Sequence, residues 1–385
     1  MNSSPVLVIG AGPAGLAVAA SLGRRGIRAV VLERADDVGA SWRRHYERLH
    51  LHTTRRWSGL PGYPIPRRFG RWVARADVVA YLEQYATHHG IEVRTGVDVT
   101  RIARGDDGGW RVETASGEAL AASTVVIATG YNHTPVPPRW PGVDRFPGEL
   151  VHASDYRNAA PYRAKDALVV GAGNTGAEIA VDLTEGGASR VRLAIRTIPH
   201  IVKRSNLGWP AQGTGILVRH LPVRVVDRIA AVTARLEVPD LSAYGLPRPT
   251  TGLYSRVMEG SVPLQDVGLI AGVRAGRIEP VAAVESFDDD GAVILADGSR
   301  LTPDAIIAAT GYRRGLEPLV GELGVLDERG LPRAHGPHTP PAAPGLYFTG
   351  YTNPISGMFR ELRIDADRIA RAIAAAAGEH VARTS

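Results

Sequence analysis

Val6-Leu-Val-Ile-Gly-Ala-Gly-Pro-Ala-Gly15 is the stretch that decides the fold, and Ala167-Leu-Val-Val-Gly-Ala-Gly-Asn-Thr-Gly176 repeats its pattern. In both stretches an apolar run typical of a buried parallel strand leads into a G-x-G-x-x-G loop, and a helical pattern comes next. Such a strand–loop–helix unit binds one dinucleotide. Two units predict two dinucleotides, the arrangement needed to pass a hydride from a nicotinamide nucleotide to a flavin. We therefore expect an α/β protein with two Rossmann-like dinucleotide-binding domains, the second inserted into the first.

The first glycine loop, residues 10–15, has each glycine where a dinucleotide needs it. Gly10 permits a sharp turn, Gly12 lets a pyrophosphate approach the backbone, and Gly15 lets the helix pack closely on the strand. Pro13 suits the first helical turn, and the helix N-terminus offers free amides to phosphates. The next apolar run ends at Glu33, whose carboxylate is placed to accept hydrogen bonds from a ribose diol.

The second glycine loop, residues 171–176, differs at the end of its second strand. The apolar run 191–195 ends at Arg196, and no acid occupies the ribose position. An arginine there pairs with the 2′-phosphate of NADPH, whereas an acid repels it. The alternative is an arginine at a solvated strand end, and Lys203 and Arg204 downstream fit either interpretation.

The composition favours a globular enzyme of two or three domains. The chain has 385 residues, of which 44% are hydrophobic and 22% charged. The net charge is +6, but the 45 Lys and Arg residues are scattered, so nucleic acid is not an expected partner. The absence of cysteine excludes a disulfide framework, a thiolate metal site and a redox dithiol, and we expect no metal.

Two further signals concern location. No apolar run reaches the roughly 18 residues of a membrane span, so no membrane association is expected. The first strand begins by Val6, which leaves no room for a signal peptide, and we expect a cytoplasmic enzyme. The oligomeric state stays open.

The regions around the second loop predict how the chain crosses between domains. Residues 77–89 predict a helix with Asp77 as its N-cap, and residues 91–122 predict a meander of short strands. Two matching apolar runs, 124–130 and 304–312, end in Ala-Thr-Gly and are typical of crossings between two nucleotide domains. The expected remaining elements are a last strand at 345–350 that returns to the first domain, a turn at 353–357 and a helix to about Ala377.

The domain limits depend on this order of elements. We expect an FAD-binding domain in two parts, with an NADPH-binding domain between them that carries a substrate-region insertion. The expected ranges are 1–150 and 286–385 for FAD, 151–285 for NADPH, and about 205–256 for the insertion.

Three further segments carry a family resemblance. Phe146-Pro-Gly148-Glu-Leu-Val-His152-Ala-Ser-Asp-Tyr156 matches the pattern FxGxxxHxxxY before the second loop. The segment from Gly39 to Thr53 and the middle region, including 221–228, 245–249 and 262–268, are similar as well. Over its full length the chain resembles class B flavoprotein monooxygenases, and within them the plant YUCCA-type enzymes. It departs from the Baeyer–Villiger pattern, which ends in Trp-Pro where this chain has Tyr156-Arg157.

The resemblance implies a two-part reaction. NADPH reduces FAD, and reduced FAD reacts with dioxygen to a C4a-peroxyflavin that delivers one oxygen atom. For a YUCCA-like enzyme the substrate is a small aryl or apolar 2-oxo acid, which is oxidised with decarboxylation. The alternatives are N- or S-oxygenation of a soft nucleophile and Baeyer–Villiger oxidation of a ketone. An alternative of another class is an FAD- and NADPH-binding redox sensor or peroxide-producing oxidase.

The candidate site residues combine the loops with the resemblance. His52 stands where amine oxygenases carry an asparagine, and it either bonds the flavin peroxide or a substrate carboxylate, or packs as a satisfied core histidine. The expected FAD contacts are Gly10, Gly12, Pro13, Ala14, Gly15, Glu33, Arg34, Trp42, Arg43, His52, Val99, Thr129, Gly130, Gly350, Gly357 and Met358. The expected NADPH contacts are Gly171, Gly173, Asn174, Thr175, Gly176, Arg196, Thr310, Gly311 and Tyr312. The expected substrate contacts are Leu207, Trp209 and Tyr244.

Overall fold

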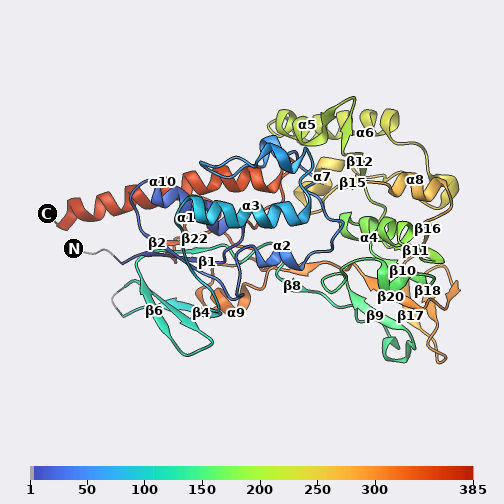
Figure 1. Cartoon of the computed structure of the whole chain (residues 1–385), viewed down its shortest axis with the longest axis horizontal. Coiled ribbons are helices and arrows are strands. Elements are labelled where there is room, and N and C mark those ends of the chain that lie inside the picture. The colour runs from blue at the N-terminus through green and yellow to red at the C-terminus, as the bar shows by residue number, and fades with distance from the viewer. Residues whose placement is uncertain (1–3, 107, 385) are drawn as a thin grey trace. The chain divides into compact units, whose positions relative to one another are not determined.

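The structure is a computed structural model that describes residues 4–106 and 108–384. The chain forms two compact units, each with its own parallel sheet (Figure 1). Unit 1 comprises Met1–Arg43, Thr54–Thr134 and Tyr312–Ser385, and unit 2 comprises Arg44–Thr53 and Pro135–Gly311.

The predicted limits at residues 150 and 285 both lie inside unit 2. One reason is that β20 (Ala305–Ala308) pairs with β10 (Asp166–Val170) and with β9 (Glu149–His152), which keeps the chain in unit 2 up to Gly311. Short strands stand at the two later crossings between the units, namely β8 (Thr134–Pro135) and β21 (Tyr312–Arg313).

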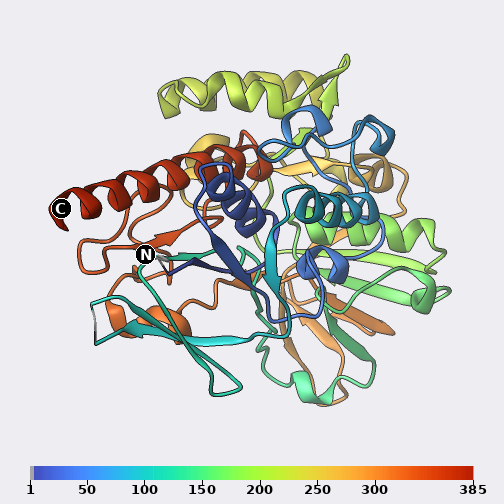
Figure 2. The same ribbon diagram turned by 60° about the vertical axis from the view of Figure 1, so that its left-hand side comes forward.

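The sheet of unit 1 is parallel throughout, and its strands are apolar and buried apart from the edge strand at 92–94, as expected for a sheet that helices flank. In spatial order its strands are β22 (Leu346–Phe348), β7 (Val125–Ile127), β1 (Val6–Ile9), β2 (Ala29–Leu32) and β3 (Glu92–Arg94). The helix α1 (Pro13–Gly23) packs against α10 (Met358–Thr384) and α3 (Arg75–His88), as Figures 1 and 2 show. The shorter helical pieces of unit 1 are α2 (Ala40–Arg44), η1 (Arg55–Trp57), η2 (Arg67–Phe69), α9 (Glu317–Val320) and η6 (Gly321–Leu323).

Two predicted helix boundaries in unit 1 need correction. The helix α3 begins at Arg75 after an extended Ala74, so Asp77 lies in its first turn and is not the N-cap. An acid there still complements the positive end of the helix. The helix α10 continues to Thr384, past the predicted end at about Ala377, because the alanine-rich run favours continued helix.

The predicted meander at 91–122 is correct only from residue 99 onward. The first strand of that range, β3, pairs in parallel with β2, where Val93 is in register with Val31. The antiparallel meander consists of β4 (Val99–Arg104), β5 (Trp110–Thr114) and β6 (Ala119–Ala122).

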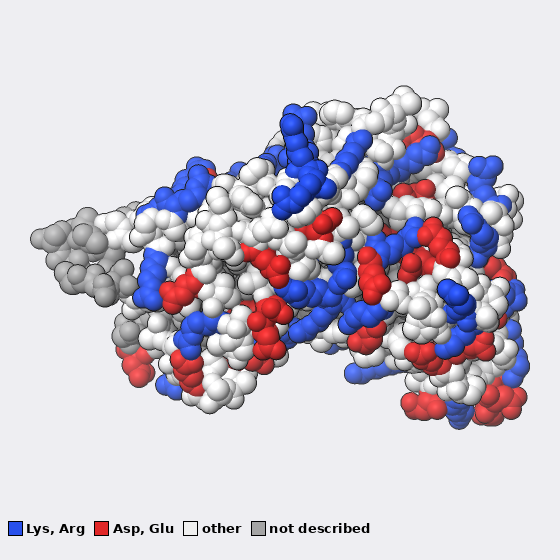
Figure 3. Space-filling view, viewed as in Figure 1, with Lys and Arg blue, Asp and Glu red and all other residues white. Residues whose placement is uncertain are grey.

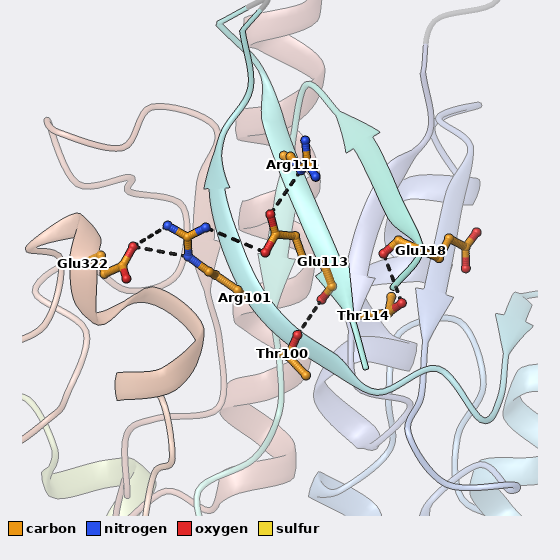
Figure 4. A network of polar contacts seen from close by, with 7 residues as sticks. All are labelled: Thr100, Arg101, Arg111, Glu113, Thr114, Glu118 and Glu322. Carbon is orange, nitrogen blue, oxygen red and sulfur yellow. Dashed lines mark hydrogen bonds and ion pairs between the residues drawn. The ribbon is translucent and has the colours of Figure 1, made fainter. Parts of the chain in front are cut away.

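The outer face of this meander is held by polar contacts between side chains of neighbouring segments (Figure 4). Arg101 pairs with Glu322 and lies 3.7 Å from Glu113, and Arg111 lies 3.1 Å from the same Glu113 carboxylate. The inner face is apolar, with Ile102, Trp110 and Val112 fully buried. The strands therefore have the alternation of a half-exposed sheet.

Unit 2 repeats the parallel design and adds a second meander. Its parallel strands, in spatial order, are β16 (Glu279–Ala282), β11 (Arg190–Ile195), β10, β20 and β9. The helix α4 (Asn174–Glu185) packs on β11 and on α8 (Leu269–Arg274). The other elements around this sheet are η3 (Val143–Arg145), η4 (Ala160–Tyr162), and the antiparallel strands β17 (Val284–Phe287), β18 (Val293–Leu295) and β19 (Arg300–Leu301).

The predicted insertion at about 205–256 lies between two paired strands of unit 2, β12 (Ile201–Lys203) and β15 (Leu264–Asp266). It holds the hairpin β13 (Ser205–Asn206) and β14 (Trp209–Pro210), with helices after it. These are α5 (Ala211–Val218), α6 (Val223–Glu237), η5 (Ser242–Tyr244) and α7 (Leu253–Met258). Along α6, four apolar side chains are exposed, namely Val225, Ile229, Val232 and Leu236.

The surface mixes charges of both signs. On the face drawn in Figure 3, basic and acidic side chains are interspersed. Partly exposed ion pairs of the chain include Arg28–Glu92 and Arg190–Glu279. Across residues 4–106 and 108–384, none of the helices combines the length and the apolar character that crossing a lipid bilayer requires.

Candidate active site

The first glycine loop, in unit 1, leaves room for a ligand at one glycine only. A Cβ on Gly10 would lie 2.7 Å from the Ala128 carbonyl oxygen, and φ is +106° there, a conformation that favours glycine. A Cβ on Gly15 would lie 1.9 Å from the Gly10 carbonyl oxygen. A Cβ on Gly12 would have no neighbour within 4 Å. Gly12 is also the N-cap of α1, so no side chain of the cap residue binds the first backbone amides of the helix. Open space beside the N-terminus of a helix is the setting in which backbone amides bind anions in proteins.

Glu33, the acid predicted to bind a ribose, is hydrogen-bonded to this loop. Its side chain is 8% exposed; Oε2 accepts a hydrogen bond from the Ala11 amide at 2.7 Å and Oε1 accepts one from Ala35 at 3.0 Å. A carboxylate has about four acceptor positions, so two amide bonds leave capacity for the hydroxyls of a ribose.

The carboxyl ends of the parallel strands bring most of the predicted flavin contacts of unit 1 to one edge. The Tyr351 hydroxyl accepts a hydrogen bond from the Thr129 amide at 3.1 Å and lies 2.8 Å from Thr129 Oγ1. Burial raises the pKa of Tyr351 to about 12, so this hydroxyl stays protonated. A Cβ on Gly350 would lie 3.4 Å from Ala14. The strand ends at 129–130 and 350 therefore meet α1 and the first glycine loop.

A residue that sequence reasoning missed lies at the same edge. Thr349 comes directly after β22, and its side-chain oxygen is buried without a hydrogen-bond partner in the described part of the chain. Such an orphan oxygen is the kind of group that a bound ligand or water satisfies. The only sequence signal is its place between an apolar strand and Gly350.

Other predicted flavin contacts are engaged within unit 1 itself. Trp42 packs edge-on against Phe359, with ring centroids 5.8 Å apart. Arg43 forms an ion pair with Glu83 and donates to the Val38 carbonyl. Arg34 is exposed after β2, Val99 is buried in the meander, and Pro13, Gly357 and Met358 lie at the starts of α1 and α10.

The second glycine loop, in unit 2, has the same geometry. A Cβ on Gly171 would lie 2.5 Å from the Ala309 carbonyl oxygen, and φ is +109°. A Cβ on Gly176 would lie 1.9 Å from the Gly171 carbonyl oxygen, whereas one on Gly173 would have no neighbour within 4 Å. The strand β11 then ends at Ile195, and Arg196 directly after it is exposed. Its guanidinium is therefore accessible to an anion.

The remaining predicted nucleotide contacts divide into bonded and accessible groups. Asn174 is tied to β15, because its amide nitrogen donates to the Pro263 carbonyl and its oxygen accepts from the Gln265 amide at 2.7 Å. Thr310 Oγ1 donates to the Val136 carbonyl, and the Gly311 carbonyl lies 3.2 Å from His152 Nε2. Burial lowers the pKa of His152. Thr175 is half-buried in α4, and Tyr312 stands in β21 of unit 1.

His52 is bonded to a buried acid that sequence reasoning missed. His52 Nε2 contacts Oε1 of Glu178 in α4, and Oε2 of the same carboxylate accepts a hydrogen bond from the Tyr46 hydroxyl at 3.1 Å. The side chain of Glu178 is 4% exposed and that of His52 is 20% exposed. The available signal was an acid within a helix segment whose neighbours Ala177 and Ile179 are apolar.

The predicted substrate contacts all lie at the surface. Leu207 is fully exposed between β13 and β14, and Trp209 and Tyr244 are 50% and 43% exposed. Trp209 Nε1 donates to Thr214 Oγ1 at 3.2 Å. The insertion therefore presents apolar side chains outward, and their contact with a substrate stays a prediction.

Comparison with known proteins gives the family. The family model for pyridine nucleotide-disulphide oxidoreductases matches residues 7–206. Indole-3-pyruvate monooxygenase YUCCA1 of Oryza sativa subsp. japonica is 37% identical over 351 residues, which cover 90% of this chain and 86% of the relative. The probable indole-3-pyruvate monooxygenase YUCCA3 of Arabidopsis thaliana is 34% identical, with coverage of 96% and 86%.

The solved structure of a flavin-containing monooxygenase from Stenotrophomonas maltophilia has the same fold. It superimposes with a TM-score of 0.71 at 24% identity, covering 96% of this chain and 99% of that one. The predicted fold of two Rossmann-like domains and the predicted resemblance are thus both confirmed. From its two glycine loops and these relatives, the chain belongs to the YUCCA family of flavin-dependent monooxygenases, which work with a flavin and a nicotinamide cofactor.

Proposed function

We propose that this enzyme uses FAD, NADPH and dioxygen to convert an aryl 2-oxo acid into the carboxylic acid one carbon shorter. The observation that carries the proposal is the 37% identity to an indole-3-pyruvate monooxygenase over 90% of the chain. One oxygen atom enters the acid product and the other leaves as water. NADPH and a proton supply the reducing equivalents, and the lost carbon leaves as carbon dioxide.

The first glycine loop supports FAD as the cofactor of unit 1. The open space at Gly12 and the amides of the α1 N-terminus suit a pyrophosphate, and Glu33 suits the ribose diol. Bound FAD would accept a hydride from NADPH and, once reduced, activate dioxygen. The protein has to orient the ring and keep water away, and the edge around 129–130 and 349–350 is the part of unit 1 available for that task.

The second glycine loop supports NADPH as the coenzyme of unit 2. Gly173 offers the same open approach to a pyrophosphate, and the exposed Arg196 suits a 2′-phosphate. No carboxylate occupies the position that Glu33 takes in unit 1. Thr175, Thr310, Gly311 and Tyr312 remain proposed nucleotide contacts, while Asn174 has its amide engaged with β15.

The substrate region is proposed to be the insertion. Its exposed apolar side chains at 207, 209 and 244 offer surface that an aryl group would cover. His52 is the polar side chain that we propose to act in the reaction. Its imidazole is held in place by Glu178, whereas a histidine that only fills a core would pack among apolar groups.

The test is a product balance on the FAD-loaded enzyme with NADPH and oxygen. Indole-3-pyruvate is compared with an amine, a sulfide and a cyclic ketone. Carbon dioxide is measured with catalase present, because free peroxide decarboxylates 2-oxo acids without an enzyme, and peroxide is measured in parallel reactions without catalase. We expect one carbon dioxide per NADPH with the 2-oxo acid and little peroxide. Oxygenated amine or sulfide without carbon dioxide would identify a heteroatom oxygenase, and lactone formation a Baeyer–Villiger enzyme. Peroxide equal to NADPH in every arm would identify an oxidase or redox sensor.

A further inference from the structure

A row of acids runs along one side of α4, the helix that begins at the second glycine loop. Glu178, Asp182 and Glu185 stand at positions i, i+4 and i+7, so their side chains share one face. Each acid takes its partner from another segment of unit 2. Glu178 contacts Tyr46 and His52, Asp182 accepts a hydrogen bond from Tyr156 at 2.6 Å, and Glu185 pairs with Arg48.

Three of these partners belong to residues 44–53, a segment that lies in unit 2 although the chain before and after it belongs to unit 1. The segment is also joined to the backbone near Tyr156, because the Glu47 amide donates to the Arg157 carbonyl at 2.8 Å. Glu178 and Glu185 therefore bind this segment to α4, and Glu178 contacts it both at Tyr46 and at His52.

Burial separates the contribution of Glu178 from that of Glu185. A buried carboxylate is tolerated only when hydrogen bonds replace its water, and the Glu178 side chain, 4% exposed, receives them from Tyr46 and His52. The Glu185 side chain is 54% exposed, and an ion pair in that setting contributes little. The attachment of the segment thus depends on Glu178.

Glu178 also orients His52. The contact between His52 Nε2 and the Glu178 carboxylate fixes which ring nitrogen faces α4. The imidazole is thereby held at one place beside the second turn of α4, with Nδ1 on the side of the ring away from that contact.

We propose that Glu178 is a positioning residue for the reaction. It orients His52 and attaches residues 44–53 to the helix whose N-terminus receives the nicotinamide nucleotide. The role in the reaction rests on the proposed function. Without Glu178 the segment detaches from α4, and hydride transfer from bound NADPH slows although FAD and NADPH still bind.

The test uses the FAD-loaded full chain and two independent measurements. Hydrogen exchange of the amides at 44–53 reports the attachment, and anaerobic stopped-flow reduction by NADPH reports the limiting rate and the dissociation constant separately. The variants are Glu178→Leu, Glu178→Gln, His52→Gln and the double variant Glu178→Gln/His52→Gln, with Glu185→Gln as the matched control on the same helix and segment. Glu178→Gln keeps the size and the hydrogen-bonding capacity, so it covers the case in which Glu178→Leu fails to fold.

We expect Glu178→Leu to raise exchange at 44–53 and to lower the limiting reduction rate at least tenfold, with the NADPH dissociation constant changed less than threefold. Glu178→Gln should lie between Glu178→Leu and the parent, and adding it to His52→Gln should have little further effect. Glu185→Gln should change the rate less than twofold. Unchanged exchange in both Glu178 variants would overturn the attachment, and raised exchange with a parental reduction rate would overturn the positioning role. A parent that NADPH does not reduce would contradict the proposed function, while hydrogen exchange would still decide the attachment.

Discussion

The two glycine loops place nearly the same demands on the chain and differ in the strand end that lies beyond each of them. In both, the first glycine has a positive φ, +106° and +109°, and the third would place a Cβ 1.9 Å from a backbone oxygen. In both, the middle glycine has open space. The first and third glycines are therefore required by the protein's own packing, whereas the packing of the chain leaves room for a side chain at the middle glycine.

The difference lies at the end of the second strand of each unit. Glu33 is buried and held by two backbone amides, while Arg196 is exposed. A buried acceptor suits neutral hydroxyls, and an accessible cation suits a phosphate. The comparison teaches that the residues which the packing requires differ from those proposed to choose the nucleotide, so substitutions should separate the two roles.

The largest effect is expected at the third glycines. Gly15→Ala or Gly176→Ala forces a methyl group into a backbone oxygen, so the free energy of unfolding should fall by about 3 kcal/mol. Urea unfolding measures this, with Gly12→Ala and Gly173→Ala as controls that fold like the parent in the absence of nucleotide. If the free energy of unfolding fell equally for substitutions at the middle and third glycines, the distinction between packing positions and ligand positions would be lost.

The middle glycines should separate the two cofactors. Gly12→Asp places a carboxylate against the proposed FAD pyrophosphate, and the purified protein should lose its flavin absorbance. Gly173→Asp should keep the flavin but weaken NADPH about 100-fold, a cost of about 2.7 kcal/mol. Absorbance spectra and reduction titrations measure the two effects. Full flavin absorbance in Gly12→Asp would mean that the first loop does not bind FAD.

Arg196 should set the choice between coenzymes. Arg196→Ala removes a charged hydrogen bond to the 2′-phosphate, so NADPH binding should weaken by roughly 1–3 kcal/mol while NADH binding is unchanged. The dissociation constants come from flavin reduction at varied coenzyme concentration. The control is Arg190→Ala, at an exposed arginine of the same strand, which should leave the binding of both coenzymes unchanged. Arg192 is not used because it is buried against Asp166. Equal losses for both coenzymes would exclude Arg196 from the phosphate site.

A smaller effect is expected on the pH dependence of the folding stability, through Asp365 in unit 1. Burial, and to a lesser degree repulsion from Glu361, raises the pKa of Asp365 in α10 to about 6, with Arg368 opposing and His335 Nδ1 3.5 Å away. The folded state therefore holds this proton more tightly than the unfolded state, and its stabilisation is lost as pH rises from about 4 through 6. Asp365→Asn should match the parent near pH 4 and exceed its stability by about 1–2 kcal/mol at pH 7. A variant less stable than the parent at pH 7 would show that an ion pair with His335 dominates.

Much of this molecule is readable in short windows of sequence. The positive φ at Gly10, the close packing of Gly15 on Gly10 and the acid or arginine after the second strand are features of segments of roughly 20 residues, and the period of apolar residues marks the strands and helices between them. For that reason the two sheets, the two loops and the contrast between Glu33 and Arg196 are predictable. The helix start at Arg75 was missed because an extended alanine caps it.

The tertiary structure alone decided which distant side chains meet. Glu178 lies 126 positions from His52, and the two side chains meet because residues 44–53 pack on α4. In the same way the tie between Asn174 and β15, across about 90 positions, depends on how the insertion folds back. Local sterics and periodicity act along the chain and leave a signature in it. The partner of a buried polar group is set by packing between remote segments, and a single sequence carries no record of that choice.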